Sequence, residues 1–214
     1  MQSRRGLVLA LCLAFCLAAS PLHAAEPRTL FQTSTLQALM AGVYDGDLTF
    51  QALARHGDFG IGTFDALDGE MIAIDGTFYQ IKADGRVSPV AEAMKTPFAA
   101  VTFFKPGRTH MIEMPLTFQQ LLAYVDRLLP SPNLPYAIRI DGLFTSVKAR
   151  SIPRQQKPYP PLAAAAKKQA VFELTNVKGV IVALRYPAYL AGVNMPGYHC
   201  HFITADRRAG GHLL

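Results

Sequence analysis

The chain has 214 residues, of which 50% are hydrophobic and 17% are charged, and its formal net charge is +6 at pH 7. This length and apolar content suffice for one large domain or two small packed halves, and they exclude an intrinsically disordered chain. The basic residues are dispersed, and no basic stripe with interleaved aromatic residues occurs, so we predict no nucleic-acid partner.

Residues 1–24 have the pattern of a secretory signal peptide. Arg4 and Arg5 precede an uninterrupted apolar run at 7–19, and small residues suited to cleavage follow near Ala24. The apolar run is shorter than the roughly 20 residues that a spanning helix needs. We therefore predict an exported protein, periplasmic or secreted, that has no membrane association after cleavage and a net charge lowered to +4 by loss of the two arginines.

Helical signals stand at three places in the mature chain. Ser34 and Gln37 have the spacing of a capping box, which predicts a short helix from Ser34. A second short helix is predicted over 49–55. The strongest helical pattern lies at 117–129, where Thr117 opens another capping box and apolar residues recur at helical spacing.

Most of the remaining chain has strand character. Asp75-Gly76 is a hairpin turn signal between two predicted strands, and Gly142 separates two more. The predicted strands cover 59–67, 70–75, 77–82, 98–104, 136–141, 143–152, 171–175 and 177–186, followed by a strand around residue 200.

The order of these elements predicts an α+β fold with two lobes of mixed β-sheet and a few helices. An N-terminal α+β lobe is expected over 25–152, and a β-rich C-terminal lobe over 163–214. Residues 153–162 are too rich in proline for regular structure, so we interpret them as a linker between the lobes. Together the lobes are expected to form one functional domain, with a metal site on strands of the C-terminal lobe.

Three histidines near the end of the chain are the strongest functional signal. His199 and His201 stand at i and i+2, which places both imidazoles on one face of a strand. Gly210 and Gly211 mark a tight turn that can bring His212 beside them. Three neutral imidazoles with an open fourth position are what a catalytic Zn²⁺ or a similar divalent ion requires.

Spacing alone leaves other interpretations open. The three histidines could be ordinary surface or core residues, or they could belong to a cupin-like or carbonic-anhydrase-like site that activates water. Cupins usually carry a glutamate soon after H-x-H, where this chain has Ile203-Thr204-Ala205. A non-enzymatic exported protein that binds a metal or a small molecule is a further alternative. Cys200 lies between the two histidines and should face the opposite side as a core residue.

Several motifs stand in one order along the chain and resemble those of the α-acetolactate decarboxylase family. The resemblance covers about Leu30 to Leu214. Its motifs are Gly60-Ile61-Gly62-Thr63-Phe64, Leu67-Asp68-Gly69-Glu70-Met71, Arg139-Ile140-Asp141-Gly142-Leu143-Phe144, Arg150 with Gln155 and Pro158-Tyr159, and Gly197-Tyr198-His199-Cys200-His201-Phe202.

The resemblance implies a role for six residues and a reaction. The metal ligands would be His199, His201 and His212, with Glu70 at the metal as a catalytic residue and a further candidate ligand, Arg150 as an active-site and substrate-binding residue, and Thr63 lining the substrate pocket. The implied reaction is decarboxylation of 2-acetolactate to (R)-acetoin and CO₂. It would use Zn²⁺ or another divalent transition metal, no organic cofactor, and a homodimeric protein.

These residue types suit that chemistry. A divalent ion at the ketone and hydroxyl oxygens can accept the electron pair left when CO₂ departs, and Glu70 is a plausible proton carrier. A clamp on the departing carboxylate would stabilise the ground state, so we expect Arg150 to orient the substrate through another oxygen or to assist proton delivery.

The family pattern continues past the third histidine with a further strand and a second active-site glutamate, whereas this sequence ends at Leu214. We therefore expect either a fragment or a variant with an incomplete pocket. An incomplete pocket would affect activity and the stereospecific protonation of the product.

Overall fold

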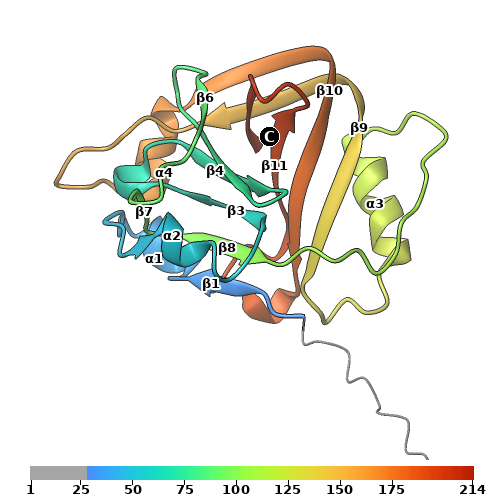
Figure 1. Ribbon diagram of the computed structural model, residues 1–214, viewed down its shortest axis with the longest axis horizontal. Coiled ribbons are helices and arrows are strands. Elements are labelled where there is room, and N and C mark those ends of the chain that lie inside the picture. Colours follow the sequence, from blue (N-terminus) through green and yellow to red (C-terminus); the bar gives the residue numbers. More distant parts are fainter. Residues whose placement is uncertain (1–27) are drawn as a thin grey trace, which may run out of the picture.

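The computed structural model describes residues 28–214, and the predicted signal peptide at 1–24 lies outside them. The fold is α+β, with β-sheets and few helices, as predicted (Figure 1). The strands are β1 (Phe31–Thr33), β2 (Leu48–Thr49), β3 (Phe59–Thr63), β4 (Glu70–Ile74), β5 (Thr77–Ile81), β6 (Val87–Pro89), β7 (Lys95–Thr96), β8 (Ala99–Thr102), β9 (Tyr136–Ser151), β10 (Ala170–Tyr186), β11 (Gly197–Thr204) and β12 (Gly210–Leu213).

The helices are short and few. They are α1 (Leu36–Met40), α2 (Phe50–Leu53), α3 (Phe118–Leu128) and α4 (Leu162–Ala165), with 3₁₀ turns at Asp65–Leu67, Ala166–Lys168 and Ala188–Leu190. None of the helices within residues 28–214 has the length and apolar character needed to cross a membrane.

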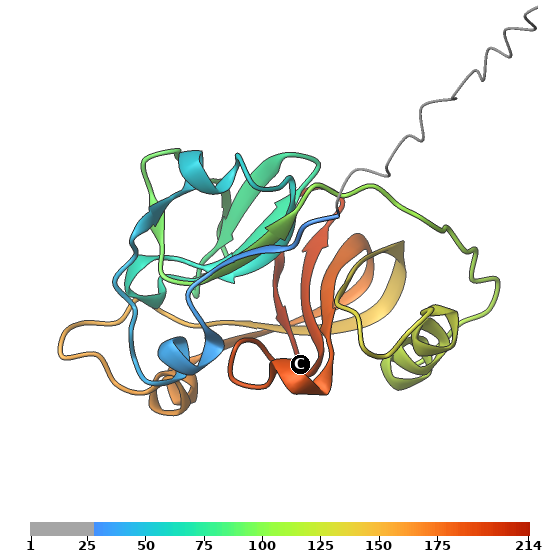
Figure 2. The same cartoon turned by 90° about the horizontal axis from the view of Figure 1, so that it is seen from below.

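Two β-structures make up the core. The N-terminal sheet has the order β1-β8-β3-β4-β5-β6, and a separate pair joins β2 to β7. The second structure is a small closed barrel in which β10, β11, β12 and β9 pair in turn. Figure 2 shows the N-terminal sheet and the barrel strands as distinct layers.

The boundary between the two β-structures differs from the predicted lobe boundary. β9 was assigned to the N-terminal lobe, but it pairs with β10 along nearly its whole length and with β12 at its end. The proline-rich segment 153–162 therefore connects two neighbouring strands of the barrel. The chain passes from the sheet to the barrel earlier, between β8 and β9, because the apolar residues Val147 and Ala149 of β9 are buried with those of β10 and β11.

Two long strands run through positions at which breaks were predicted. Gly142 lies inside β9 opposite Gly179 of β10, so the predicted strands at 136–141 and 143–152 form one strand. Packing explains the glycine at position 179, because a Cβ there would lie 2.3 Å from the Phe202 ring. A glycine inside a strand often marks this kind of close approach.

The helix caps confirm one prediction and shift another. Thr117 accepts from the Gln120 N–H, and the Gln120 side chain accepts from the Thr117 N–H, which is the predicted capping box of α3. The cap of α1 is Thr35, whose hydroxyl accepts from Ala38 N–H, whereas the prediction placed it at Ser34. Ser34 has φ 61, a left-handed conformation that an N-cap residue does not adopt.

The apolar core is layered around the two β-structures. One cluster fills the space between the sheet and the barrel, and it includes Ile61, Ile72 and Ile81 from the sheet and Val182, Leu184 and Ile203 from the barrel. A second cluster lies between the sheet and α2. A third joins all four barrel strands to Leu121 and Val125 of α3. Side chains in the first cluster therefore lie at the interface between the N-terminal sheet and the barrel.

Candidate active site

The three C-terminal histidines converge on one point. In the antiparallel pair β11–β12, His201 lies directly opposite His212, and His199 is on the same face as His201. The His199 Nε2 to His212 Nδ1 distance is 3.2 Å, and the His212 Nδ1 to His201 Nε2 distance is 3.3 Å. His199 and His201 are buried, and His212 is partly exposed. The H-x-H spacing and the Gly210-Gly211 turn thus produce the cluster that they predicted.

The nitrogen spacing fits a tetrahedral metal. Ligands at 2.0–2.1 Å from a tetrahedral zinc ion lie about 3.3 Å from one another. The two distances above are close to this value, and the ligand atoms of all three histidines lie within 4.8 Å of one another. The three facing nitrogens cannot all be paired by protons, since His212 Nδ1 faces two imidazoles and can give a hydrogen to one. The group therefore has the donor set and geometry to hold a metal ion.

One histidine is oriented by the backbone of the other β-structure. His201 Nδ1 lies 2.9 Å from the carbonyl oxygen of Met71 at the start of β4, so its N–H donates there and Nε2 is left free for a metal. His199 also presents Nε2 to the cluster, which puts its proton on Nδ1. That buried nitrogen has no hydrogen-bond partner among the described residues.

Glu70 and Arg150 form an ion pair beside the histidines. Glu70 points to the barrel because it shares the face of Ile72 and Ile74 in β4. Its Oε1 accepts from Arg150 Nη1 at 2.9 Å, and its Oε2 lies 3.6 Å from His201 Nε2. Arg150 lies opposite His212 in the β9–β12 pair. The pair therefore brings together residues from two β-structures that are 80 positions apart in sequence.

Burial controls the protonation of this cluster. Burial and, to a smaller extent, the nearby Arg150 charge together lower the pKa of His199 to about 4. Burial also depresses the pKa of His201 and His212, so all three imidazoles are neutral at pH 7, as metal binding requires. Burial raises the pKa of Glu70 to about 7, although Arg150 and a backbone hydrogen bond from Ile152 favour the carboxylate.

Comparison with known proteins identifies the family to which the chain belongs. The sequence model described as alpha-acetolactate decarboxylase matches residues 30–214. The chain belongs to the alpha-acetolactate decarboxylase family. This membership favours the decarboxylase interpretation over the cupin-like and carbonic-anhydrase-like sites that the histidine spacing alone left open.

Curated members of this family are similar over most of the chain. The alpha-acetolactate decarboxylase of Methanosarcina mazei is 55% identical over 185 residues, which are 86% of this chain and 64% of that protein. That of Methylococcus capsulatus is 51% identical over 189 residues, or 88% of this chain and 73% of that protein. The crystal structure of the Bacillus subtilis protein matches with a TM-score of 0.85 at 46% identity and covers 86% of this chain and 79% of that one. The chain thus spans less than two thirds of the length of the Methanosarcina mazei protein.

Thr63, matched to the family's substrate pocket by resemblance, makes a contact of its own. Its side chain is buried, and its hydroxyl donates to the carbonyl oxygen of Gly69 at 2.7 Å. Thr63 is also the cross-strand partner of Glu70. In this conformation the hydroxyl supports the turn that leads into Glu70, and a contact with substrate stays a prediction.

The turn that delivers Glu70 is strained and tightly held. Ala66 and Leu67 both have positive φ, at 57° and 58°, which is uncommon for residues with side chains. Ala66 N–H donates to Tyr44 O, and Ala66 O accepts from Gln155 N–H. Strained backbone of this kind persists where the surroundings over-determine it, often at functional sites. In this alpha-acetolactate decarboxylase fold the strain lies just before Glu70.

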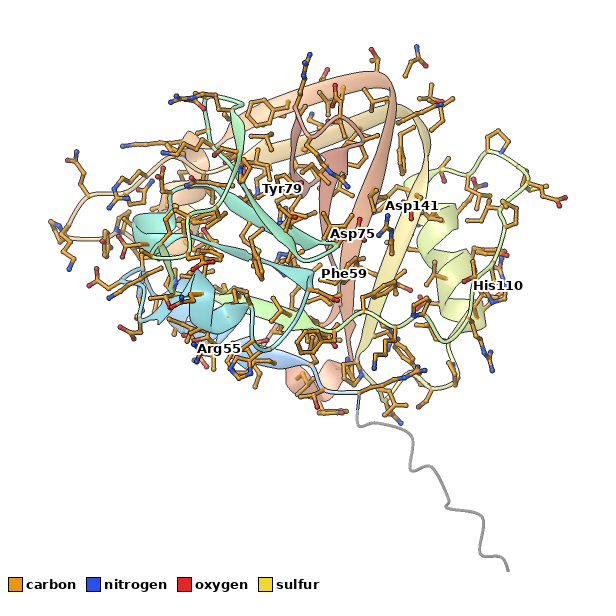
Figure 3. The ribbon with its side chains drawn as sticks, in the orientation of Figure 1. Arg55, Phe59, Asp75, Tyr79, His110 and Asp141 are labelled. Carbon is orange, nitrogen blue, oxygen red and sulfur yellow. The ribbon has the colours of Figure 1, made fainter. Side chains whose placement is uncertain are left out.

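His110 and Cys200 take no part in the cluster, and His56 is exposed just after α2. His110 is exposed on the loop before α3, away from the C-terminal strands (Figure 3). Cys200 faces the barrel core with Phe202, and burial raises the pKa of its thiol to about 12. Cys200 is therefore a packed core residue, as its place between the two histidines predicts.

Sequence reasoning did not find every contact of the site. It named Glu70 and Arg150 but not their direct pairing, because their strands belong to different β-structures. It also missed the Met71 carbonyl that orients His201, since a backbone group leaves no side-chain signal. A similar cross-link has no local sequence signal either: Arg139 bonds both Asp75 at the β4–β5 turn and Asp141 on β9. Figure 3 labels the two aspartates.

Proposed function

We propose that this chain catalyses the metal-dependent decarboxylation of 2-acetolactate to (R)-acetoin and CO₂. The observation that carries the proposal is the convergence of three neutral imidazoles next to the Glu70–Arg150 pair, in a chain of the alpha-acetolactate decarboxylase family. No organic cofactor is required for this chemistry.

His199, His201 and His212 would hold the metal, and we propose Zn²⁺ because imidazole donors and tetrahedral spacing both suit it. When bound, the ion would supply Lewis acidity toward the ketone and hydroxyl oxygens of the substrate, where the electron pair released with CO₂ can be stabilised. Glu70 Oε2 lies close enough to His201 to face the same substrate atoms.

Glu70 is suited to carry the proton. The carbon–carbon bond to the carboxylate breaks, CO₂ leaves without the bonding electrons, and the carbon that keeps them must gain a proton. A carboxyl whose pKa is about 7 can hold that proton at neutral pH and give it up readily, after which water restores it. Delivery from one fixed oxygen favours one face of the carbon and hence one enantiomer.

Arg150 is suited to orient Glu70 and the substrate. Its Nη1 is engaged with Glu70 Oε1, and its charge lies near the histidines. An arginine that grips a carboxylate of the protein itself does not need to clamp the departing carboxylate of the substrate. This arrangement avoids stabilising the ground state against loss of CO₂.

Product analysis tests the proposed function. Metal-loaded protein is incubated with racemic 2-acetolactate, and acetoin is quantified and resolved by chiral chromatography. We expect an excess of (R)-acetoin, and a loss of at least about a hundredfold in rate for Glu70→Gln. Glu92→Gln is the matched control, because Glu92 is exposed and bonds Gln51. Acetoin formation no faster than without protein would contradict the activity, and a racemic product would contradict the role of Glu70.

We also propose export and a homodimer. The basic and apolar residues at 1–24 support export, which cell fractionation tests by locating a shortened chain outside the cytoplasm. Exposed apolar side chains such as Met111, Met114 and Leu143 support association of two copies, which sedimentation tests through the mass in solution. A cytoplasmic full-length chain or a monomer at micromolar concentration would contradict the respective proposal.

A further inference from the structure

Ser151 is a buried polar residue that the proposed mechanism does not use. It is fully buried at the end of β9, and its hydroxyl donates to the carbonyl oxygen of Ile81 in β5 at 2.8 Å. This hydrogen bond joins the barrel to the N-terminal sheet. A buried hydroxyl–carbonyl bond of this kind fixes the distance between two elements, since breaking it leaves a buried acceptor unsatisfied.

The bond lies at the point where the two halves of the site meet. Ile81 is the cross-strand partner of Glu70. On the other side, the chain neighbours of Ser151 both reach Glu70: Arg150 through its guanidinium, and Ile152 through a backbone hydrogen bond. Arg150 and Ser151 at the end of β9, and Ile152 directly after it, therefore contact the Glu70–Ile81 pair of the other β-structure.

The Ile81 carbonyl has little freedom to move. Gly69, with φ +99°, lies against it so closely that a Cβ at Gly69 would be 2.4 Å from the Ile81 oxygen. The hydroxyl of Ser151 holds the same oxygen from the barrel side. Glu70 follows Gly69 directly, so the position of this carbonyl sets where β9 can sit relative to the Glu70 carboxylate.

We propose that Ser151 is a positioning residue, which fixes β9 against β5 so that Arg150 and Glu70 meet in productive geometry. The expected change in kcat rests on the proposed function. The expected change in the Arg150–Glu70 distance rests on the geometry alone. Misplacing a catalytic pair by about 1 Å can cost as much as a hundredfold in rate.

The test compares Ser151→Ala with Thr96→Val. Thr96 is equally buried and also donates to a carbonyl, that of Phe98 at 2.9 Å, but it belongs to the β2–β7 pair, which is separate from the sheet that carries Glu70. With metal content equal to wild type, we expect Ser151→Ala to lower kcat about tenfold or more and to change KM less than about threefold. Thr96→Val should stay within about twofold of wild type after correction for folded protein.

A double-variant cycle separates positioning from general destabilisation. In an Arg150→Lys background, Ser151→Ala should cost less than about twofold in kcat, because the pair that it positions is already broken. Full additivity, or a Ser151→Ala kcat within about twofold of wild type, would overturn the proposal. If Ser151→Ala does not fold, Ser151→Cys takes its place, since its thiol is a weak donor with a larger atom and cannot restore the 2.8 Å contact with the Ile81 carbonyl. A wild-type kcat for that variant would overturn the proposal too.

A crystal structure of Ser151→Ala gives the readout that does not depend on activity. We expect the Arg150 Nη1 to Glu70 Oε1 distance to lengthen beyond hydrogen-bonding range from its present 2.9 Å. An unchanged distance would overturn the positioning role. If wild-type protein forms no acetoin, the proposed function fails, and this distance still decides the inference about Ser151.

Discussion

Arg150 influences every other residue of the site. It bonds Glu70, and its positive charge adds to burial, the main cause, in lowering the pKa of His199, His201 and His212, so that they are neutral and can bind a cation. A single guanidinium thus favours an anionic Glu70 and neutral imidazoles together. Burial opposes the first effect and reinforces the second.

Arg150→Lys should therefore keep the metal and lose most of the turnover. A lysine retains the charge but not the planar fork that reaches Glu70, so we expect a loss of about tenfold to a hundredfold in kcat. Arg154→Lys is the matched control, since Arg154 forms a more exposed ion pair with Asp65. Elemental analysis and kinetics measure the two properties separately, and loss of metal from Arg150→Lys would count against this role.

At this scale the sequence predicted the histidines better than their neighbours. The i, i+2 spacing and the Gly-Gly turn are local, and local geometry follows from period and turn chemistry. The contact of Arg150 with Glu70 is set by how two β-structures pack, which no short window encodes. The neighbours of Arg150 on its face, Lys148 and Ser146, suited an exposed strand equally well.

The β3–β4 connection is the element that places Glu70, and Gly69 is its tightest point. Gly69 and Gly76 both have positive φ, +99° and +77°, but only Gly69 is in close contact, while a Cβ at Gly76 would meet nothing within 4 Å. A substitution at Gly76 therefore reports backbone strain alone, whereas one at Gly69 reports strain together with steric overlap.

Gly76→Ala should cost about 1 kcal/mol of unfolding free energy, the usual cost of a left-handed residue with a side chain. Gly69→Ala should cost about 3 kcal/mol or more and should also lower kcat, because the Ile81 carbonyl and Glu70 must move. Urea denaturation and steady-state kinetics measure both. Equal effects of the two substitutions would show that the contact of Gly69 with Ile81 is unimportant.

Element types were predictable and some element ends were not. The capping box of α3 and the Asp75-Gly76 hairpin follow from residue chemistry, and both are present. The predicted break in β9 failed because Gly142 pairs with Gly179 within the ladder. The predicted break in β10 at residue 176 failed because Thr175 and Val177, on either side of it, both pair with β9. The cap of α1 moved by one residue, since Thr35 offers the same hydroxyl as Ser34.

At the scale of the whole molecule, the buried titratable cluster makes metal-free protein sensitive to acid. The pKa values of His199, His201 and His212 are lowered from 6.5, so below about pH 6.5 the unfolded chain binds protons that the folded chain does not. Glu70 acts in the opposite sense, because its raised pKa lets the folded chain hold a proton between 4.5 and about 7.

The net uptake on unfolding is two protons, so stability should fall by about 3 kcal/mol per pH unit as pH drops from 6.5 toward 5. Chelator-treated protein unfolded in urea at several pH values measures this slope, with His201→Asn expected to reduce it by about 1.4 kcal/mol per unit. A stability that is constant or rises over this interval would contradict the burial of the neutral imidazoles.

The α+β class and the C-terminal location of the histidine cluster followed from the order of predicted elements. The place of β9 in the barrel could not be predicted in this way, because strand pairing depends on which apolar faces meet in three dimensions. Val147 and Ala149 show that β9 belongs to the barrel only once their packing against Ile181 and Phe202 is known.

The central claim is that one ion held by His199, His201 and His212 enables decarboxylation. Zinc is titrated into chelator-treated, folded protein while bound metal and acetoin formation are followed together, with His201→Ala and the exposed-residue control His56→Ala in parallel. We predict that acetoin formation rises with bound zinc and saturates at about one ion per chain, and that it is lost with His201→Ala and kept with His56→Ala. Folded protein that binds no zinc, or that forms acetoin equally well without it, would contradict the account.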